Sequence, residues 1–373
     1  MPTSTSHPDR NATGRLSPLD RFLPLWILSA MAAGLLLGRS FSGLNDVIDS
    51  ARIGEVSLPI AIGLLIMMYP VLAKVNYSKV GEVTGDRRML TTSLILNWVV
   101  GPAVMFALAW IFLPDLPAYR TGLIIVGLAR CIAMVLIWND LACGSGEVAA
   151  VLVALNSLFQ VFAYALLGWF YLQALPQWLG LDNGATLAVS MWEIARTVLI
   201  FLGIPLLAGY LTRMWGVRLK GAEWYETKFI PRISPFALYG LLFTIVVMFA
   251  LQGDKITALP FDVLRIAVPL VAYFAIMWGF SFTIGYRMRF SYGRNTALSF
   301  TAAGNNFELA IAVAIGVFGI ASGEALATVV GPLIEVPVLV GLVYVSLWAK
   351  RHFYTPEGIP SIDDPAATKT GDR

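Results

Sequence analysis

The chain has 373 residues, of which 58% are hydrophobic and 13% are charged, and its mean hydropathy is +0.74. Soluble domains carry about 25% charged residues, so this composition excludes a soluble globular protein and indicates a multi-pass membrane protein. The formal net charge of +3 reflects orientation in the membrane and gives no reason to expect a nucleic-acid partner.

Apolar stretches of about 20 residues, the length that crosses a bilayer, recur ten times along the chain. They cover residues 22–38, 58–73, 90–113, 121–141, 148–175, 190–211, 233–252, 262–286, 296–320 and 325–348. The first stretch has no evident cleavage site after it, which favours a true span over a signal peptide. The polar ends, residues 1–20 and 352–373, are expected to be disordered.

The distribution of Lys and Arg predicts how these spans are oriented, because such residues accumulate in cytoplasmic segments. With the N-terminus in the cytoplasm, nineteen Lys and Arg residues fall on the cytoplasmic side and five on the other, while Arg130 and Arg196 lie inside spans. We therefore expect a protein of the cell membrane with both termini in the cytoplasm.

Two parts of the chain are copies of one segment. Residues 121–162 align without a gap with residues 298–339, at a constant offset of 177 in residue number that pairs Cys131 with Glu308. The copies are five spans apart, so they must cross the bilayer in opposite directions. Residues 21–176 and 190–350 are therefore predicted to be two inverted five-span repeats, an architecture of secondary transporters.

Polar residues interrupt the fourth and ninth spans at the same depth. They are Arg130 and Cys131 in the fourth span, and Gly304, Asn305, Asn306 and Glu308 in the ninth. Non-helical backbone at this depth is tolerated only where it is buried in protein or lines a wet cavity. We expect two discontinuous, crossed spans whose half-helix N-termini face a polar solute. The plainer alternative is that Glu308 only caps a half-helix, since it follows Asn305 by three residues.

Further polar residues lie in other spans. The tenth span carries a second acid, Glu335, between two prolines. This acid could pair with Arg130 or carry protons, and the sequence leaves both roles open. Asn97 and Asn139 are additional polar groups that could support the site.

A thiol at the centre of a transport path favours a soft, thiophilic solute. Arg130 and a half-helix N-terminus would favour the thiolate form of Cys131, and a single thiolate lets its solute leave again. The two asparagines of the ninth span would hydrogen-bond hydroxyl groups of the solute, while Glu308 or Glu335 would take up and release protons. No cofactor is expected, and because both histidines lie at the chain ends, a His-based metal site in the membrane is excluded.

Four segments resemble the ten-span arsenical-resistance permeases of the bile acid/arsenite/riboflavin transporter superfamily. They are residues 59–75, 127–139 (with Gly-Leu-Ala-Arg-Cys), 305–314 (with Asn-Asn-Phe-Glu) and 331–338 (Gly-Pro-Leu-Ile-Glu-Val-Pro-Val), and the resemblance extends over residues 20–350. It implies an all-α integral membrane fold of ten helices and export of arsenite in exchange for protons, and leaves open whether antimonite is carried. It also implies functional roles for Cys131 and Glu308, with Arg130 and Glu335 as a charged pair.

Three other functions compete with this one. A sodium-coupled organic-anion symporter of the same fold would need a sodium site, and no acidic cluster of that kind stands out in the sequence. An intramembrane enzyme would need paired Asp residues or a Ser/Lys or Ser/His dyad at membrane depth, and the spans carry none. The flux of solute through a channel would not saturate as the solute concentration rises, whereas the flux through a carrier would. We expect a transporter whose partners are arsenite, protons and membrane lipid.

Overall fold

The computed structural model describes residues 22–41, 52–53, 56–75, 86–181, 190–258, 260–319 and 322–361, most of which are helical. In these residues the strands form a single short hairpin, with β1 (Arg52–Ile53) antiparallel to β2 (Val56–Ser57). The mostly helical architecture that was predicted is therefore confirmed, and it fits an integral membrane protein.

Within this part of the chain, six continuous helices are long and apolar enough to cross a membrane. They match the third, fifth, sixth, seventh, eighth and tenth apolar stretches, whereas α2 (Leu23–Ser40) and α4 (Leu58–Lys74) are shorter. The six are built from α6 (Arg87–Ile95), η2 (Leu96–Val100) and α7 (Gly101–Phe112); α10 (Gly146–Trp169), η3 (Phe170–Ala174) and α11 (Leu175–Trp178); α12 (Met191–Val198), η4 (Leu199–Gly203) and α13 (Ile204–Lys220); α14 (Ala222–Trp224), η5 (Tyr225–Phe229) and α15 (Ile230–Ala258); α16 (Pro260–Arg287); and α19 (Gly323–Phe353).

Four of these helices contain one wide turn, and each wide turn stands just before a proline. The π-helical segments η2, η3, η4 and η5 end two residues before Pro102, Pro176, Pro205 and Pro231, respectively. Proline has no N–H to donate, and its ring collides with the carbonyl group four residues earlier in a regular α-helix. Widening the preceding turn relieves this collision, so each helix continues instead of ending at its proline.

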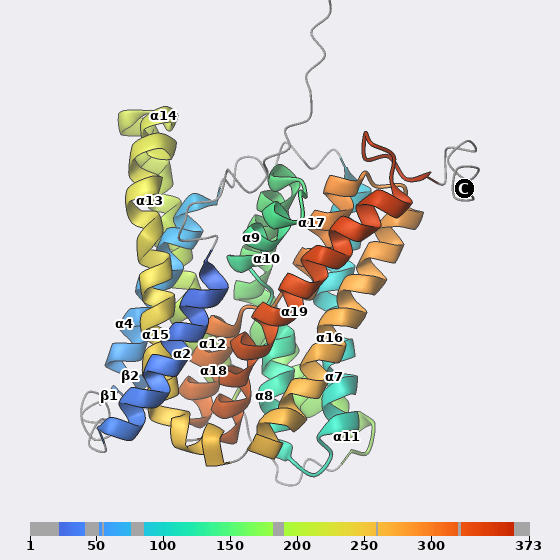
Figure 1. Ribbon diagram of the computed structural model, residues 1–373. Helices are drawn as coiled ribbons and strands as arrows, with labels where there is room; N and C mark the ends of the chain where they lie inside the picture. The colour runs from blue at the N-terminus through green and yellow to red at the C-terminus, as the bar shows by residue number, and fades with distance from the viewer. Residues whose placement is uncertain are drawn as a thin grey trace, which may run out of the picture.

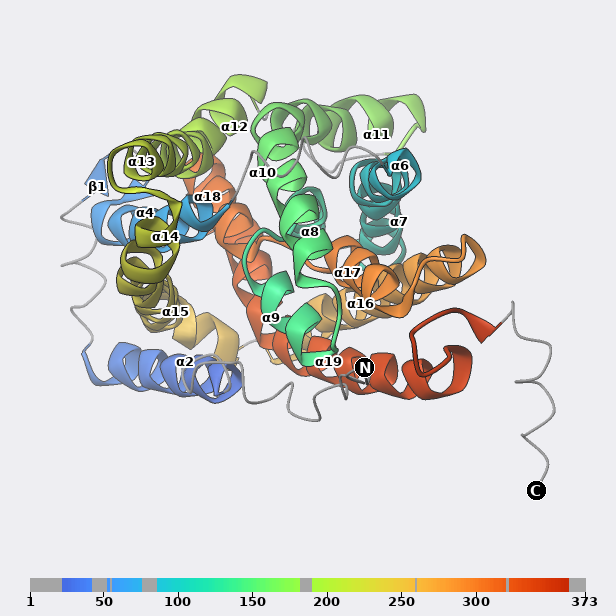
Figure 2. The ribbon, with the colours of Figure 1, turned by 90° about the horizontal axis from the view of Figure 1, so that it is seen from above.

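The helices form two groups (Figures 1 and 2). In the first group, α15 packs against α2 and α4, and α13 packs against α4. Glycines allow this close packing, because a Cβ on Gly34 of α2 would lie 2.6 Å from the carbonyl oxygen of Val246 in α15. The second group contains α7, α10, α16, α19 and four half-length helices described below. The helix α12–α13 joins the groups, since α12 contacts α10 and α18 while α13 contacts α4.

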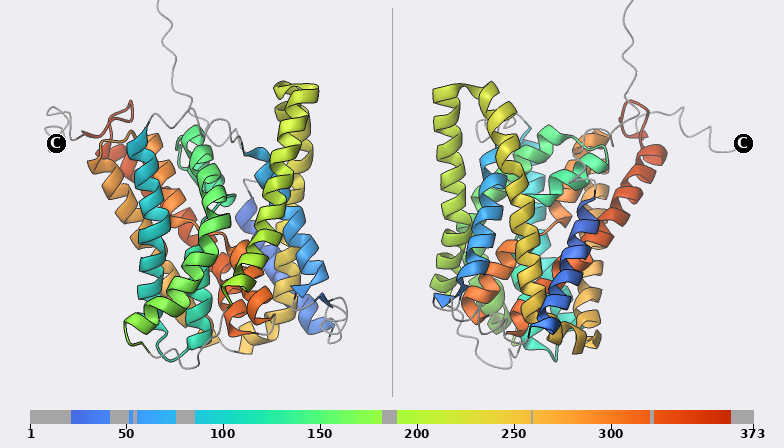
Figure 3. Two further views of the ribbon diagram at one scale, coloured as in Figure 1. Left: turned by 180° about the vertical axis from the view of Figure 1, so that it is seen from behind. Right: turned by 60° about the vertical axis from the view of Figure 1, so that its left-hand side comes forward.

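Both ends of the helical part lie on one side of the molecule. In the side views, α2 begins and α19 ends at the top (Figures 1 and 3). This arrangement fits two termini on the same side of a membrane, and the assignment of that side to the cytoplasm stays a prediction.

The expected disorder at the two ends meets different outcomes. Residues 1–20 and 362–373 lie outside the described residues. For residues 352–361 the expectation is wrong, because α19 runs to Phe353 and Tyr354 pairs with Pro360 in a short bridge. The Tyr354 hydroxyl accepts a 2.8 Å hydrogen bond from Asn295, and its ring is buried, so one aromatic side chain anchors an otherwise polar segment.

Candidate functional site

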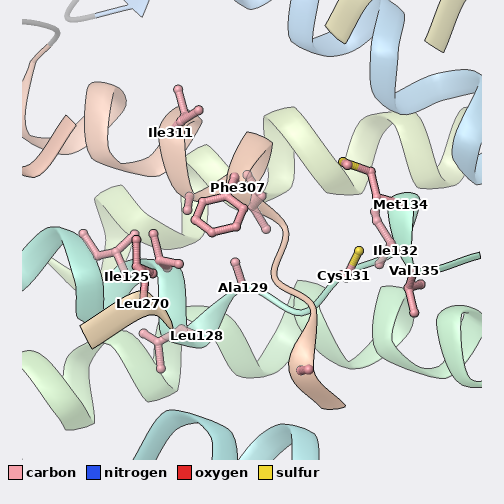
Figure 4. Close-up of a cluster of buried hydrophobic side chains, with 14 of the residues drawn as sticks. Ile125, Leu128, Ala129, Cys131, Ile132, Met134, Val135, Leu270, Phe307 and Ile311 are labelled. Atoms are coloured by element: carbon pink, nitrogen blue, oxygen red, sulfur yellow. The ribbon is translucent and has the colours of Figure 1, made fainter. Parts of the chain in front are cut away.

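Two helices of the second group are interrupted, and the interruptions lie against each other. The first joins α8 (Pro117–Leu128) to α9 (Met134–Leu141), and the second joins α17 (Tyr292–Ala303) to α18 (Phe307–Phe318). Arg130 forms an antiparallel bridge with Asn305. Figure 4 shows Cys131 on the extended backbone at this crossing, with Met134 pointing to the same side.

Four backbone N–H groups at the crossing are paired either with the facing segment or with a neighbouring helix. The Cys131 N–H donates to the Gly304 carbonyl at 3.2 Å, and the Asn306 N–H donates to the Ala129 carbonyl at 3.0 Å. Two side chains add to these bonds: Gln160 on α10 accepts from the Arg130 N–H, and Glu335 on α19 accepts from the Asn305 N–H at 3.4 Å. These bonds explain how non-helical backbone can lie in an apolar interior, where an unpaired N–H would be costly.

The register of these bonds corrects the alignment made from sequence. Arg130 and Gln160 correspond to Asn305 and Glu335, and both correspondences have an offset of 175 rather than 177 in residue number. The same smaller offset relates the first and last residues of α8 to those of α17. The offset of 177 does hold where α10 and α19 begin, since Ser145 and Ser322 are both N-caps. At the crossing, therefore, Cys131 corresponds to Asn306, and Glu308 is displaced by two positions from it.

A cavity of about 320 Å³ lies between the first helix group and the crossing. Its walls come from α4, α15, the first interruption with α9, and the start of α18, and they are mostly apolar. The residues with polar or sulfur-containing side chains are Met67, Met68, Lys74, Cys131, Met134, Asp140, Ser234, Asn305, Asn306 and Glu308. Lys74, Asp140 and Ser234 lie near helix ends on the side predicted to be cytoplasmic, so the cavity extends from the crossing toward that side.

Four of the predicted site residues meet in this cavity: Cys131, Asn305, Asn306 and Glu308 all line it. Glu308 is half-buried, whereas the other three are almost fully buried. The residue that caps α18 is Asn306, whose Oδ1 accepts from the Leu309 N–H at 3.0 Å, while the Asn305 amide donates to the carbonyls of Val126 and Ala129. Asn305 and Glu308 thus do not form the capping box that the sequence allowed, and the Glu308 carboxyl remains at the cavity.

Arg130 lies behind the cavity and does not line it. Its guanidinium is fully buried and donates to the Tyr273 hydroxyl at 2.7 Å and to the Gly127 carbonyl. Neighbouring residues of an extended segment point to opposite sides, which is why Arg130 faces α16 while Cys131 faces the cavity. Among the ion pairs of the described residues, none joins Arg130 to Glu335, so their expected charge pairing is not formed in this conformation.

The two supporting asparagines also lie away from the cavity. Asn97 is buried in η2 and accepts from Asn156 at 3.4 Å, and Asn139 is buried one residue before Asp140, which does line the cavity. Sequence reasoning did not assign roles to Gln160 or Tyr273. The spacing of 30 residues from Arg130 to Gln160 and from Asn305 to Glu335 is a signal that could have identified Gln160.

Known proteins are similar to this chain over most of its length. Residues 61–259 match the Sodium Bile acid symporter family. The arsenical-resistance protein Acr3 of Corynebacterium glutamicum is 59% identical, with 91% of each chain covered, and that of Alkaliphilus metalliredigens is 31% identical over 90% of this chain and 94% of its own. The uncharacterized transporter slr0944 of Synechocystis is 35% identical over 92% of each chain.

Proposed function

The chain belongs to the Sodium Bile acid symporter family and, within it, to the arsenical-resistance permeases, and from this premise we propose that it exports arsenite from the cytoplasm across the cell membrane. Proteins of this family are transporters, and the chain is not an enzyme. The choice of arsenite is supported by the Acr3 name of two relatives, one of which is 59% identical.

The observation that carries this proposal is the position of Cys131. Its thiol is on non-helical backbone that lines a cavity, and the carboxyl group of Glu308 and the amides of Asn305 and Asn306 line the same cavity. Sulfur ligands favour soft elements, of which trivalent arsenic is one. When the thiol reacts with arsenite, As(OH)3, a sulfur–arsenic bond forms and one arsenic–oxygen bond breaks. The thiol proton leaves with the departing hydroxyl as water, and attack by water reverses the step.

Hydrogen bonds from the second interruption would orient the solute. Asn306 Nδ2 and Asn305 Oδ1 have no hydrogen-bond partner in the described part of the chain, so the two asparagines that line the cavity keep one donor and one acceptor unpaired. A single thiol with two neutral amides would hold arsenite without trapping it, which a carrier requires because it must release its solute on the other side.

We assign proton exchange to Glu308. This carboxyl lines the cavity and is half-buried, whereas Glu335 lies behind the crossing and accepts the Asn305 N–H. In the proposed antiport cycle, the arsenite-loaded carrier moves outward with Glu308 ionised, and the empty carrier returns with Glu308 protonated. The cavity extends toward the predicted cytoplasmic side, which is the side from which arsenite would enter.

The same proposal includes ten spans in two inverted five-span repeats. Four helices that are too short or too interrupted to count as continuous spans, namely α2, α4, α8–α9 and α17–α18, would add to the six continuous helices. The repeat is supported by a shared offset in residue number, which relates α8 to α17 and also relates the two side chains that accept from the crossing.

Flux measurements in proteoliposomes test this function. Purified protein should move arsenite against its gradient when a proton gradient is imposed, and a sodium gradient should have no effect. Arsenite flux that follows sodium, or sodium-driven flux of an organic anion without arsenite flux, would contradict the proposal and favour the symporter of the same fold. A protein that moves no arsenite under either gradient would also contradict it.

A further inference from the structure

The transport cycle described above gives no role to Gln160, although its polar side chain is fully buried next to the crossing. It lies on α10 with no exposed surface, and its Oε1 accepts the hydrogen bond from the Arg130 N–H. Arg130 directly precedes Cys131, so this bond fixes the backbone at the residue next to the thiol. The backbone bonds across the crossing run from the Cys131 N–H to Gly304 and from the Asn306 N–H to Ala129.

The second interruption is held in the same way by a different residue type. Glu335 on α19 accepts from the Asn305 N–H, and 30 residues separate acceptor and donor in both cases. The two parts of the chain thus share one arrangement, in which a long side chain from the neighbouring helix accepts from an N–H that the broken helix cannot pair. If Gln160 only filled space on α10, there would be no reason for its side chain to match Glu335 in both spacing and hydrogen bonding.

We propose that Gln160 is a positioning residue for the arsenite site, because it fixes the extended backbone that places Cys131 at the cavity. This inference rests on the proposed function only for the identity of the solute. Without an acceptor at position 160 the Arg130 N–H has no partner in the described structure, and the segment gains by moving toward another acceptor or back into a helical turn. Either movement carries the Cys131 sulfur away from the two asparagines and Glu308.

The side-chain amide of Gln160 differs from the carboxyl group of Glu335, its counterpart at the second interruption, in its ability to ionise. Glutamine cannot ionise, so the segment that carries the thiol is held by a neutral acceptor, while the segment that carries the asparagines is held by an acid. Gln160→Glu keeps an acceptor of the same length, Gln160→Asn withdraws it by one methylene group, and Gln160→Leu removes it. The three variants therefore form a series in which the hydrogen bond to the Arg130 N–H is kept, weakened or removed.

The test uses full-length protein with Cys143→Ser, so that Cys131 is the only thiol of the chain. Phe162→Leu, on the exposed face of the same helix, is the matched control. Two quantities are measured for each variant: the KM and maximal rate of arsenite transport in proteoliposomes, and the rate at which a maleimide labels Cys131 with and without arsenite.

Gln160→Leu is expected to raise the KM for arsenite about tenfold, with a smaller change in maximal rate per folded protein, and to change the labelling rate of Cys131. Gln160→Glu should restore both quantities, Gln160→Asn should fall between, and Phe162→Leu should match the parent. If Gln160→Leu does not fold, the comparison of Gln160→Asn with Gln160→Glu carries the test.

The inference is overturned if the acceptor-free or shortened variants keep the parent's KM and labelling rate, or lose only maximal rate in step with the amount of folded protein. Labelling without arsenite does not depend on the solute. A parent that transports no arsenite would therefore end the proposed function, while the labelling series would still decide whether Gln160 positions Cys131.

Discussion

Gly304→Ala tests the close approach of the two interruptions. A Cβ at this position would lie 2.9 Å from the Cys131 Cβ, 3.2 Å from the Phe300 carbonyl oxygen and 3.6 Å from the Cys131 sulfur. Carbon atoms in contact prefer about 3.5–4.0 Å, so the segments would have to separate by roughly 0.5–1 Å. Gly304 has φ −70° and ψ 145°, which alanine adopts without strain, so the substitution isolates crowding from backbone effects.

Crowding of this kind costs about 1–3 kcal/mol, and a displacement of about 1 Å at a reacting atom can cost on the order of 100-fold in rate. Gly304→Ala should therefore lower the melting temperature of the purified protein and raise the KM for arsenite at least about tenfold. Gly341→Ala on α19 is the control, because a Cβ there meets nothing within 4 Å. If Gly304→Ala melts and transports like Gly341→Ala, the backbone contact between the interruptions is not as described.

Two further predictions concern charged groups. Glu308→Gln should remove the response of arsenite transport to an imposed proton gradient, whereas Glu335→Gln should keep it. Of these two acids it is Glu308 that lines the cavity, and glutamine at position 335 still accepts from Asn305. Flux measured over a series of pH gradients decides, and the opposite pattern would reverse the assignment. In the connection between α7 and α8, hydrogen bonding to the Arg265 guanidinium lowers the pKa of Asp115 from 3.8 to about 2. Because the folded-state pKa is the lower one, this pair stabilises the fold above about pH 4, and its contribution is lost as the pH falls toward 2. The melting temperature of Asp115→Asn should accordingly vary less than that of the parent over this interval, and an identical variation would show that the pair contributes nothing.

The interruptions and the residues at the cavity could be predicted from the sequence, because polar groups in an apolar span must be enclosed by protein or line a wet cavity. Their equal depth in the fourth and ninth spans, together with the repeat that relates these spans, groups Cys131, Asn305, Asn306 and Glu308, and all four line one cavity. The broken helices follow from the same argument, since non-helical backbone must be enclosed by protein.

The sequence could not predict how the interruptions pair. Similar residues around Ser145 and Ser322 favoured an offset of 177, but hydrogen bonding at the crossing follows 175. The first part of the chain has two fewer residues than the second between the crossing and its N-cap, and two more between the N-cap and the accepting side chain. The sequence also could not predict which way the Arg130 side chain points. Its pairing with Tyr273 depends on the extended backbone at the break, in which neighbours point apart, and not on the order of residues.

Arsenite export by Cys131→Ser protein tests the central claim most directly. Serine retains the size and hydrogen bonding of cysteine but lacks the soft sulfur, and Cys143→Ser is the matched control because Cys143 does not line the cavity. In everted membrane vesicles with an imposed proton gradient, we predict that Cys131→Ser loses arsenite transport while Cys143→Ser transports like the parent. Transport by Cys131→Ser at the parent's rate would contradict a sulfur-based site at the crossing.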